Sequence, residues 1–290
     1  MTSSAPGQAN YQLGPASSFV LIGSQRSGTN FLREVLNTHP NLAVHGEVLW
    51  PYPHPSIWHN YVRTAVSRAM PPVLAADATA LVDDYFVYLA DDTMRGHPHK
   101  AKDLLWVGID VKYNQLRHIA PLIQDLMAPP FLLGYFRERR VPILHLHRRN
   151  VLHQALSMVI ADQRNVYHDY QGRGFDERIT VNPKTVIDRC HWIRAERDLF
   201  RELGKDLEVL ELAYEDIAAA CDGLEADKPL ADGNASLAQI AAFLKVPCTF
   251  ARPGSISKVI DKPYQDVLAN HGEVLRQVER SEFREFASTI

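Results

Sequence analysis

Short apolar runs alternate along this chain with segments whose apolar residues recur at helical spacing. The clearest run is 19–22, which is continuously apolar and ends at Gly23. Further runs that end in polar residues lie at 107–111, 141–146 and 207–212. Continuous apolar runs of this length are typical of strands buried on both faces of a parallel sheet. Because helical patterns lie between the runs, the chain is predicted to be α/β, with a central parallel β-sheet flanked by helices in three layers.

A helix is predicted directly after the first run. Within 30–37, Phe31, Leu32, Val35 and Leu36 fall on one face, and the polar segment 37–40 with its proline ends the pattern. The segment is therefore a strand, loop and helix unit. In open sheets of this kind, ligands bind at the carboxyl ends of the strands.

The domain organisation follows from length and local composition. Residues 1–17 are small and polar and are predicted to form a flexible N-terminal tail. Residues 18–290 are predicted to form a single domain, since α/β nucleotide-binding folds often reach this length. The proline-rich stretch at about 50–106 is interpreted as an irregular insertion that could shape an acceptor site.

Charge and composition narrow the function classes. The formal net charge of −3 argues against nucleic-acid binding driven by the overall charge of the protein. No run approaches the about 20 apolar residues of a membrane span, and the first residues lack a signal-peptide pattern. We therefore expect a cytoplasmic protein without a stable membrane span. The three cysteines are widely spaced and are expected to be reduced thiols.

The loop between the first strand and helix, 23–30 (GSQRSGTN), has the spacing of a nucleotide phosphate loop. Main-chain N–H groups and the helix dipole create an anion site at such a position. The GK[ST] ending that contacts the β/γ-phosphates and magnesium is absent, which disfavours an ATPase or kinase. Arg26 stands inside the loop instead, where a guanidinium can make paired hydrogen bonds to phosphate. The loop indicates a nucleotide anion that is handled without a metal.

The segment 25–29 (QRSGT), followed by a helix and His39-Pro40, resembles the 5′-phosphosulfate loop of sulfotransferases that use 3′-phosphoadenosine 5′-phosphosulfate (PAPS). The resemblance is to the bacterial nodulation-factor, carbohydrate and tyrosylprotein branches. It implies a P-loop-like fold, PAPS as co-substrate, no metal, and Arg26 near the bridging oxygen of the leaving group. Asn30 stands where the family more commonly has threonine. By this resemblance the loop residues that bind the donor are Gln25, Arg26, Ser27, Gly28, Thr29 and Asn30.

A second segment, 144–157, runs from a predicted strand into a helix and resembles the family's 3′-phosphate motif. The resemblance implies that Arg149 and Ser157 hold the 3′-phosphate, with Arg148 as the alternative if the register differs by one. Two cations at a helix start oppose its dipole and invite an anion. Near the C-terminus, Lys258 matches the family's last phosphate-binding loop and is a further cofactor-binding candidate. The segments 108–115 and 214–216 are similar to other stretches of these enzymes.

Sulfuryl transfer passes through a loose in-line transition state, so the enzyme contributes mainly positioning and charge stabilisation. It also needs a base that accepts the proton of the acceptor hydroxyl. In the glycan and tyrosylprotein branches a glutamate downstream of the loop has this role, and Glu47 is in the matching place. His45 is the alternative base. Arg26 and Lys112 are expected to stabilise developing charge. The candidate catalytic residues are thus Glu47, Arg26, Lys112 and His45.

The expected function is transfer of the sulfuryl group of PAPS to a hydroxyl of a carbohydrate, lipid-linked or other small acceptor. Two alternatives stay open: a small-molecule kinase that uses ATP on a related loop, and a non-catalytic nucleotide-binding protein. The histidine pairs at 97/99 and 145/147 lack a nearby carboxylate or cysteine set in sequence, so no metal site is predicted. Aromatic residues that either stack on an acceptor ring or belong to the core are Trp50, Tyr52, Trp58 and Tyr61.

Overall fold

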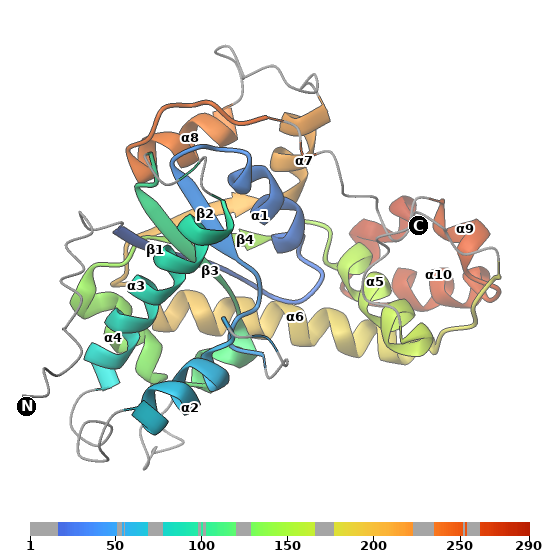
Figure 1. Cartoon of the computed structure of the whole chain (residues 1–290). Helices are drawn as coiled ribbons and strands as arrows, with labels where there is room; N and C mark the ends of the chain where they lie inside the picture. Colours follow the sequence, from blue (N-terminus) through green and yellow to red (C-terminus); the bar gives the residue numbers. More distant parts are fainter. Residues whose placement is uncertain are drawn as a thin grey trace, which may run out of the picture.

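A five-stranded sheet, in which every neighbouring pair is parallel, forms the centre of the molecule (Figure 1). The computed structural model describes residues 17–50, 54, 56–68, 78–97, 100, 103–119, 129–165, 177–222, 235–251, 253 and 262–290. The strand order is β2-β3-β1-β4-β5. The strands are β1 (Ser17–Gly23), β2 (Leu42–His45), β3 (Trp106–Lys112), β4 (Ile143–His147) and β5 (Val209–Ala213).

The four predicted strands are confirmed as β1, β3, β4 and β5. Strand β2 was not predicted, because its apolar part is only Leu42, Ala43 and Val44, too short to distinguish from a loop. It lies at the edge of the sheet and pairs only with β3. Because β2 ends at His45, Glu47 follows an edge strand and lies at the carboxyl end of the sheet.

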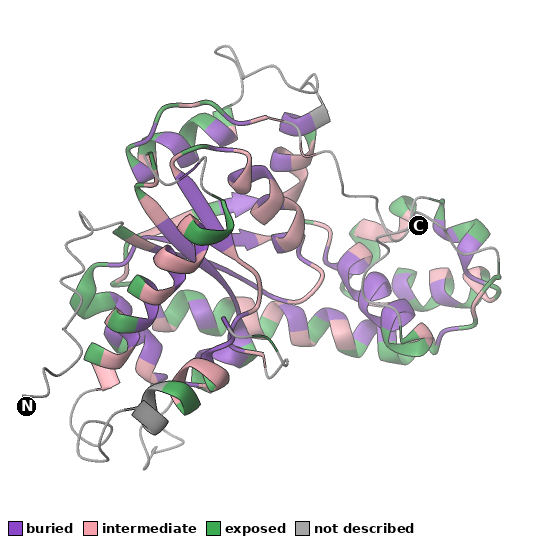
Figure 2. Cartoon of the chain, in the orientation of Figure 1, coloured by how far each residue is buried: buried purple, intermediate pink, exposed green. Residues whose placement is uncertain are grey.

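Helices cover both faces of the sheet, which confirms the three-layer α/β prediction (Figure 1). Phe19 and Leu21 of β1 face one core, and Val20 and Ile22 face the other, as alternation along a strand requires. Figure 2 shows that strands β1 to β4 are largely buried between these layers, whereas β5 is buried only at its end. One face is covered by α1 (Thr29–Asn37), α7 (Tyr214–Asp222) and α8 (Ala235–Leu244), and the other by α3 (Ala78–Gly96), α4 (Phe131–Arg139) and α6 (Pro183–Leu203).

A third hydrophobic cluster lies beside the sheet, where α6 extends beyond it (Figure 1). It joins α5 (Val151–Arg164) and α6 to the C-terminal elements, so that the last residues of the chain pack against the helix that follows β4. Those elements are α9 (Tyr264–Val267), α10 (His271–Glu279) and η4 (Arg284–Thr289). The cluster therefore brings the C-terminal segment near the carboxyl end of β4.

The predicted insertion is not irregular in its described part. It contains α2 (Trp58–Arg68) and the 19-residue helix α3. Helix α3 buries Val82, Phe86 and Leu89 against the sheet, an amphipathic pattern that the aromatic and proline content of the stretch obscured. Trp58 belongs to this core and Tyr61 packs against it, whereas Tyr52 lies outside the described residues.

A buried lysine holds the end of α1 to the start of β2. The Nζ atom of Lys100 donates to the carbonyl oxygens of Asn37 at 2.7 Å, His39 at 3.3 Å and Leu42 at 2.7 Å. Burial lowers the pKa of Lys100 to about 8. These contacts fix the turn that precedes β2, and with it the route of the chain to Glu47.

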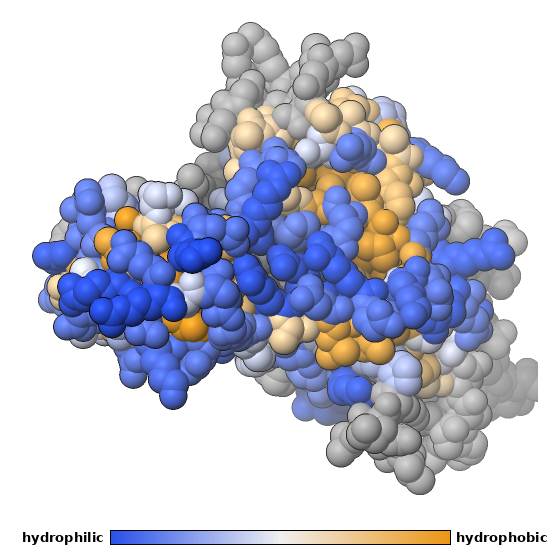
Figure 3. Space-filling model, turned by 180° about the vertical axis from the view of Figure 1, so that it is seen from behind, coloured by the Kyte–Doolittle hydropathy of each residue, from blue (hydrophilic) through white to orange (hydrophobic). Residues whose placement is uncertain are grey.

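Apolar side chains also reach the surface, mostly over the sheet-bearing part of the face seen in Figure 3. The large apolar residues that are exposed among those described are Val87 on α3, Leu105 just before β3 and Leu199 on α6. Scattered residues of this kind are ordinary on a folded surface. Within the described part of the chain, no helix combines the length and apolar character needed to cross a membrane.

Candidate active site

The loop between β1 and α1 has the backbone of an anion-binding turn. Gly28 precedes the helix with a φ of 98°, and a Cβ atom there would lie 2.2 Å from Cδ2 of Tyr214. Only glycine fits both constraints. The hydroxyl of Ser27 donates to the carbonyl oxygen of Ser24 at 2.8 Å and tightens the turn. No described side chain caps the start of α1, and its first turn holds no acidic residue, so its N–H groups suit an anion.

Arg26 joins the two predicted phosphate-binding motifs. Its Nε atom donates to Oγ of Ser157 at 3.0 Å, across 131 residues of sequence. Helix α5 holds the loop a second time, since Nε2 of Gln154 donates to the carbonyl oxygen of Gln25 at 2.7 Å and also to the hydroxyl of Ser24. The loop of β1 and the helix after β4 thus form one continuous surface at the carboxyl end of the sheet.

This surface is cationic. Burial lowers the pKa of Arg26, and the charge of Arg148 lowers it further. Burial raises the pKa of the Tyr264 hydroxyl to about 12, against the influence of Arg148 and Arg26. The hydroxyl of Tyr264 donates to the carbonyl oxygen of His153 at 3.1 Å. A guanidinium group whose positive charge is destabilised by a neighbouring guanidinium is suited to an anionic ligand that both can bind.

The neighbouring arginines Arg148 and Arg149, which follow β4, have different surroundings. The side chain of Arg149 is 58% exposed and forms a bidentate ion pair with Asp216. Arg148 is less exposed and lies over the ring of Tyr214, with 4.2 Å between its Cζ atom and the ring centroid. Its buried Nε atom has no hydrogen-bond partner among the described residues. Of the two neighbouring arginines, Arg148 is the one whose charge lowers the pKa of Arg26.

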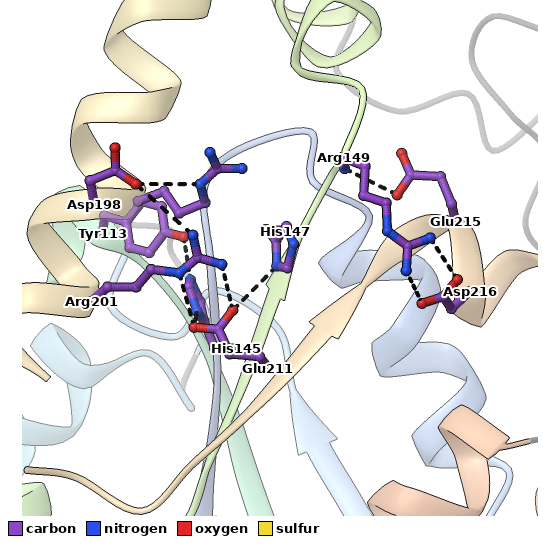
Figure 4. Close-up of polar contacts among 10 residues, drawn as sticks. Tyr113, His145, His147, Arg149, Asp198, Arg201, Glu211, Glu215 and Asp216 are labelled. Carbon is purple, nitrogen blue, oxygen red and sulfur yellow. Dashed lines mark hydrogen bonds and ion pairs between the residues drawn. The ribbon is translucent and has the colours of Figure 1, made fainter. Parts of the chain in front are cut away.

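The start of α5 already has an anion from the chain itself. The carboxylate of Glu215 accepts from the main-chain N–H groups of Arg149 at 3.1 Å and Asn150 at 3.3 Å (Figure 4). Together with Asp216 it offsets the two cations at this helix start. The mismatch of charge and dipole seen in the sequence therefore does not by itself require a ligand.

A second group of polar side chains meets at the end of β3. The Nζ atom of Lys112 lies 2.5 Å from Oγ1 of Thr29, 2.6 Å from Oδ1 of Asp110 and 3.6 Å from Oε1 of Glu47. Nε2 of Gln115 donates to the same glutamate at 3.4 Å. The structure thus brings together the candidate base, the candidate cation and the phosphate loop.

The backbone at Glu47 adopts an unusual conformation. The non-glycine residues with positive φ among those described are Arg26, Glu47, Arg140, Asn165 and Lys245. The last three end helices α4, α5 and α8, where left-handed residues are common. Arg26, at 59°, and Glu47, at 28°, do not end helices, and strain of this kind concentrates at functional sites.

The other predicted site residues have mixed placements. His45, on β2, is hydrogen-bonded through Nε2 to the hydroxyl of Thr93 at 2.9 Å, and burial lowers its pKa. Asn30 accepts from Nη1 of Arg33 at 3.0 Å within α1. Lys258 lies outside the described residues. Asp110 was missed by sequence reasoning, although a carboxylate in the otherwise apolar run 107–111 is a signal that could have identified it.

A chain of polar groups runs from Tyr113, which follows β3, through His145 on β4 to Glu211 on β5 (Figure 4). Nε2 of His145 is 2.5 Å from the hydroxyl of Tyr113, and its Nδ1 is 2.8 Å from Oε1 of Glu211. Burial raises the pKa of Glu211, but hydrogen bonds from His145 and Arg201, together with the nearby imidazole of His147, outweigh it and hold this pKa well below the usual range. Glu211 is therefore a carboxylate close to His145 and His147 in space, although none lies close to them in the sequence. Even so, no cluster of metal-ligand type occurs within the described ranges.

Comparison with known proteins gave results for solved structures only, since no family model and no curated protein matches the chain. The sulfotransferase domain from the curacin biosynthetic pathway is 16% identical, with a TM-score of 0.43 over 88% of this chain and 83% of that one. The sulfotransferase domain of the Synechococcus PCC 7002 olefin synthase is 18% identical, with a TM-score of 0.36 over 84% and 80%. Mouse sulfotransferase SULT7A1, complexed with PAP, is 11% identical, with a TM-score of 0.42 over 95% and 90%.

Proposed function

We propose that this chain is a PAPS-dependent sulfotransferase. One observation carries the proposal: Arg26 of the predicted 5′-phosphosulfate loop donates to Ser157 of the predicted 3′-phosphate motif at 3.0 Å. The two motifs were identified separately in the sequence, and a donor with phosphates at both ends requires them to lie side by side. A mononucleotide without a 3′-phosphate would not need the second motif.

In the proposed complex, the N–H groups at the start of α1 and the side chain of Arg26 bind the 5′-phosphosulfate. Arg148 and Ser157 bind the 3′-phosphate. We propose Arg148 instead of Arg149 for this role, because Arg149 is exposed and paired with Asp216, whereas the charge of Arg148 lowers the pKa of Arg26 and its buried Nε atom has no partner among the described residues. Lys258 stays a candidate for the same phosphate.

The proposed reaction is an in-line displacement at sulfur. The hydroxyl oxygen of the acceptor forms a bond to sulfur while the bond from sulfur to the bridging oxygen of the 5′-phosphate breaks. The acceptor proton passes to the carboxylate of Glu47, and 3′-phosphoadenosine 5′-phosphate (PAP) leaves. Arg26 and Lys112 stabilise the charge that develops on the transferring group and the leaving phosphate. The acceptor class is a hydroxyl of a carbohydrate, a lipid-linked or another small molecule.

The kinase alternative is retained for a specific reason. The sequence offered no lysine in the loop, yet the ammonium of Lys112 lies 2.5 Å from Thr29 at its end. A cation at this position would also suit the phosphates of ATP. The donor must therefore be tested directly against ATP.

The first test is a thermal-shift titration with PAP, ATP plus magnesium, and adenosine 5′-phosphosulfate. We expect strong stabilisation by PAP alone, of about 2.7 kcal/mol at a hundredfold excess over its dissociation constant. Stabilisation only by ATP with magnesium would favour the kinase, and no response to PAP would refute the proposed function.

Turnover is tested by following PAP release from PAPS in the presence of sugar, lipid-linked and phenolic acceptors. Glu47→Gln should lose turnover by about 100-fold or more while it still binds PAP, because a general base contributes to the chemical step. Glu138→Gln is the matched control, since Glu138 is an exposed glutamate on α4. Equal turnover of the two variants would exclude Glu47 as the base.

A further inference from the structure

The phosphate loop carries no lysine, but a lysine from another strand reaches it. In loops of the lysine type, the lysine follows the second glycine. Thr29 occupies that position here, and the Nζ atom of Lys112 lies 2.5 Å from its Oγ1 atom. Strand β3 pairs directly with β1, and Lys112 is the register partner of Gly23, the first loop residue. The side chain of Lys112 is 3% exposed, so its ammonium group is held at the loop and does not extend into solvent.

Asp110 accounts for how this ammonium stays buried. It precedes Lys112 by two residues on β3, so both side chains leave the strand on the same face. Its side chain is fully buried, and Oδ1 lies 2.6 Å from Nζ. Its Oδ2 atom has no hydrogen-bond partner in the part of the chain that the structure describes. A buried carboxylate requires a paired cation, and the two residues satisfy that requirement for each other.

Glu47 competes for the same cation and is more distant. Its Oε1 atom lies 3.6 Å from Nζ, beyond hydrogen-bond distance, whereas the Asp110 contact is a short charge-assisted hydrogen bond. Lys112 and Asp110 together form a neutral pair. Glu47 therefore keeps a carboxylate that is not closely paired, which is the form a general base needs.

We propose that Asp110 is a positioning residue that holds Lys112 against the phosphate loop as a strand-borne substitute for a loop lysine, and keeps it from pairing closely with Glu47. This inference rests on the proposed function of the same site. It assigns a role to Asp110, and it explains how a second cation, in addition to Arg26, reaches a loop that has threonine in place of lysine.

The first test removes the negative charge of Asp110 while it keeps the size and shape of the side chain. In Asp110→Asn, Lys112 loses its ionic partner and pairs with Glu47, so we expect kcat to fall about tenfold or more. The acidic limb of the kcat profile should move to lower pH, because a close ammonium lowers the pKa of a carboxylate. The charged groups that face this region are Lys112 and Asp110 on β3 and Arg33 on α1, while Gln115 is neutral. A merely structural residue would lower the melting temperature without moving the limb.

The second test moves the lysine into the loop. Lys112→Met should lose about 100-fold in turnover, the scale of removing one donor from a transition-state anion site. Adding Thr29→Lys to that variant returns an ammonium to the same place and should recover at least about tenfold of the loss. Thr29→Gln in the Lys112→Met background is the matched control, since it adds a long side chain without charge.

The outcomes separate this inference from the proposed function. If the wild-type protein fails to bind PAP, the sulfotransferase proposal itself is wrong. If PAP binds and Asp110→Asn keeps the turnover and pH profile of the wild type, only the role of Asp110 is overturned. If Asp110→Asn does not fold, the lysine relocation decides: recovery in the Thr29→Lys double variant supports the inference, and turnover equal to that of the Thr29→Gln control overturns it.

Discussion

Replacement of Arg148 by alanine should weaken PAP binding far more than the same replacement of Arg149. Arg148 lies over Tyr214, its charge lowers the pKa of Arg26, and its buried Nε atom lacks a hydrogen-bond partner among the described residues. A hydrogen bond to a charged group contributes about 1.5–3 kcal/mol. Since about 1.4 kcal/mol corresponds to a tenfold change in affinity, the dissociation constant of PAP should rise about 10- to 150-fold in Arg148→Ala.

Arg149→Ala is the matched control for this prediction. Its guanidinium is exposed and paired with Asp216, and exposed pairs of this kind contribute little. We expect the PAP dissociation constant to change by less than about threefold. Isothermal titration calorimetry with PAP measures both variants, and Arg148→Lys shows how much of the effect is charge. The reverse order of effects would refute the assignment and restore Arg149 as the phosphate ligand.

Two further predictions concern stability and pH. Lys100→Met should lower the free energy of unfolding by about 2 kcal/mol, because three main-chain carbonyl oxygens lose their donor. Urea denaturation measures this loss, and an unchanged midpoint would show that water replaces the ammonium. Burial raises the pKa of Glu196 from 4.5 to about 7, against the opposing charge of Arg189. The folded state therefore binds the proton more tightly, and the stability that this proton provides is complete below pH 4.5 and lost as the pH rises through 7. The melting temperature of Glu196→Gln relative to the wild type should thus increase over that interval, and a constant difference would contradict the shift.

The sequence alone determined the layers of the fold and the location of the glycine-containing turn between β1 and α1. Both depend on local information: a continuous apolar run predicts a strand buried on both faces, and the glycine spacing of 23–28 predicts a tight turn before a helix. Gly28 illustrates why this works, since its φ of 98° is a requirement of the turn itself. The short edge strand β2 and the helices of the predicted insertion were missed. Their hydrophobic patterns are too short, or too interrupted by other residues, to be distinguished from those of loops.

Only the tertiary structure decided how distant residues combine in the site. The sequence could not choose between Arg148 and Arg149, because adjacent residues at a strand end have the same local pattern and only their partners, Tyr214 and Asp216, distinguish them. The sequence also could not predict that Lys112, which is paired with Asp110, contacts Thr29, since the contact with Thr29 depends on β3 lying next to β1 in the sheet. Local propensity and spacing act over a few residues, whereas ion pairing in a buried site depends on which strand ends the fold brings together.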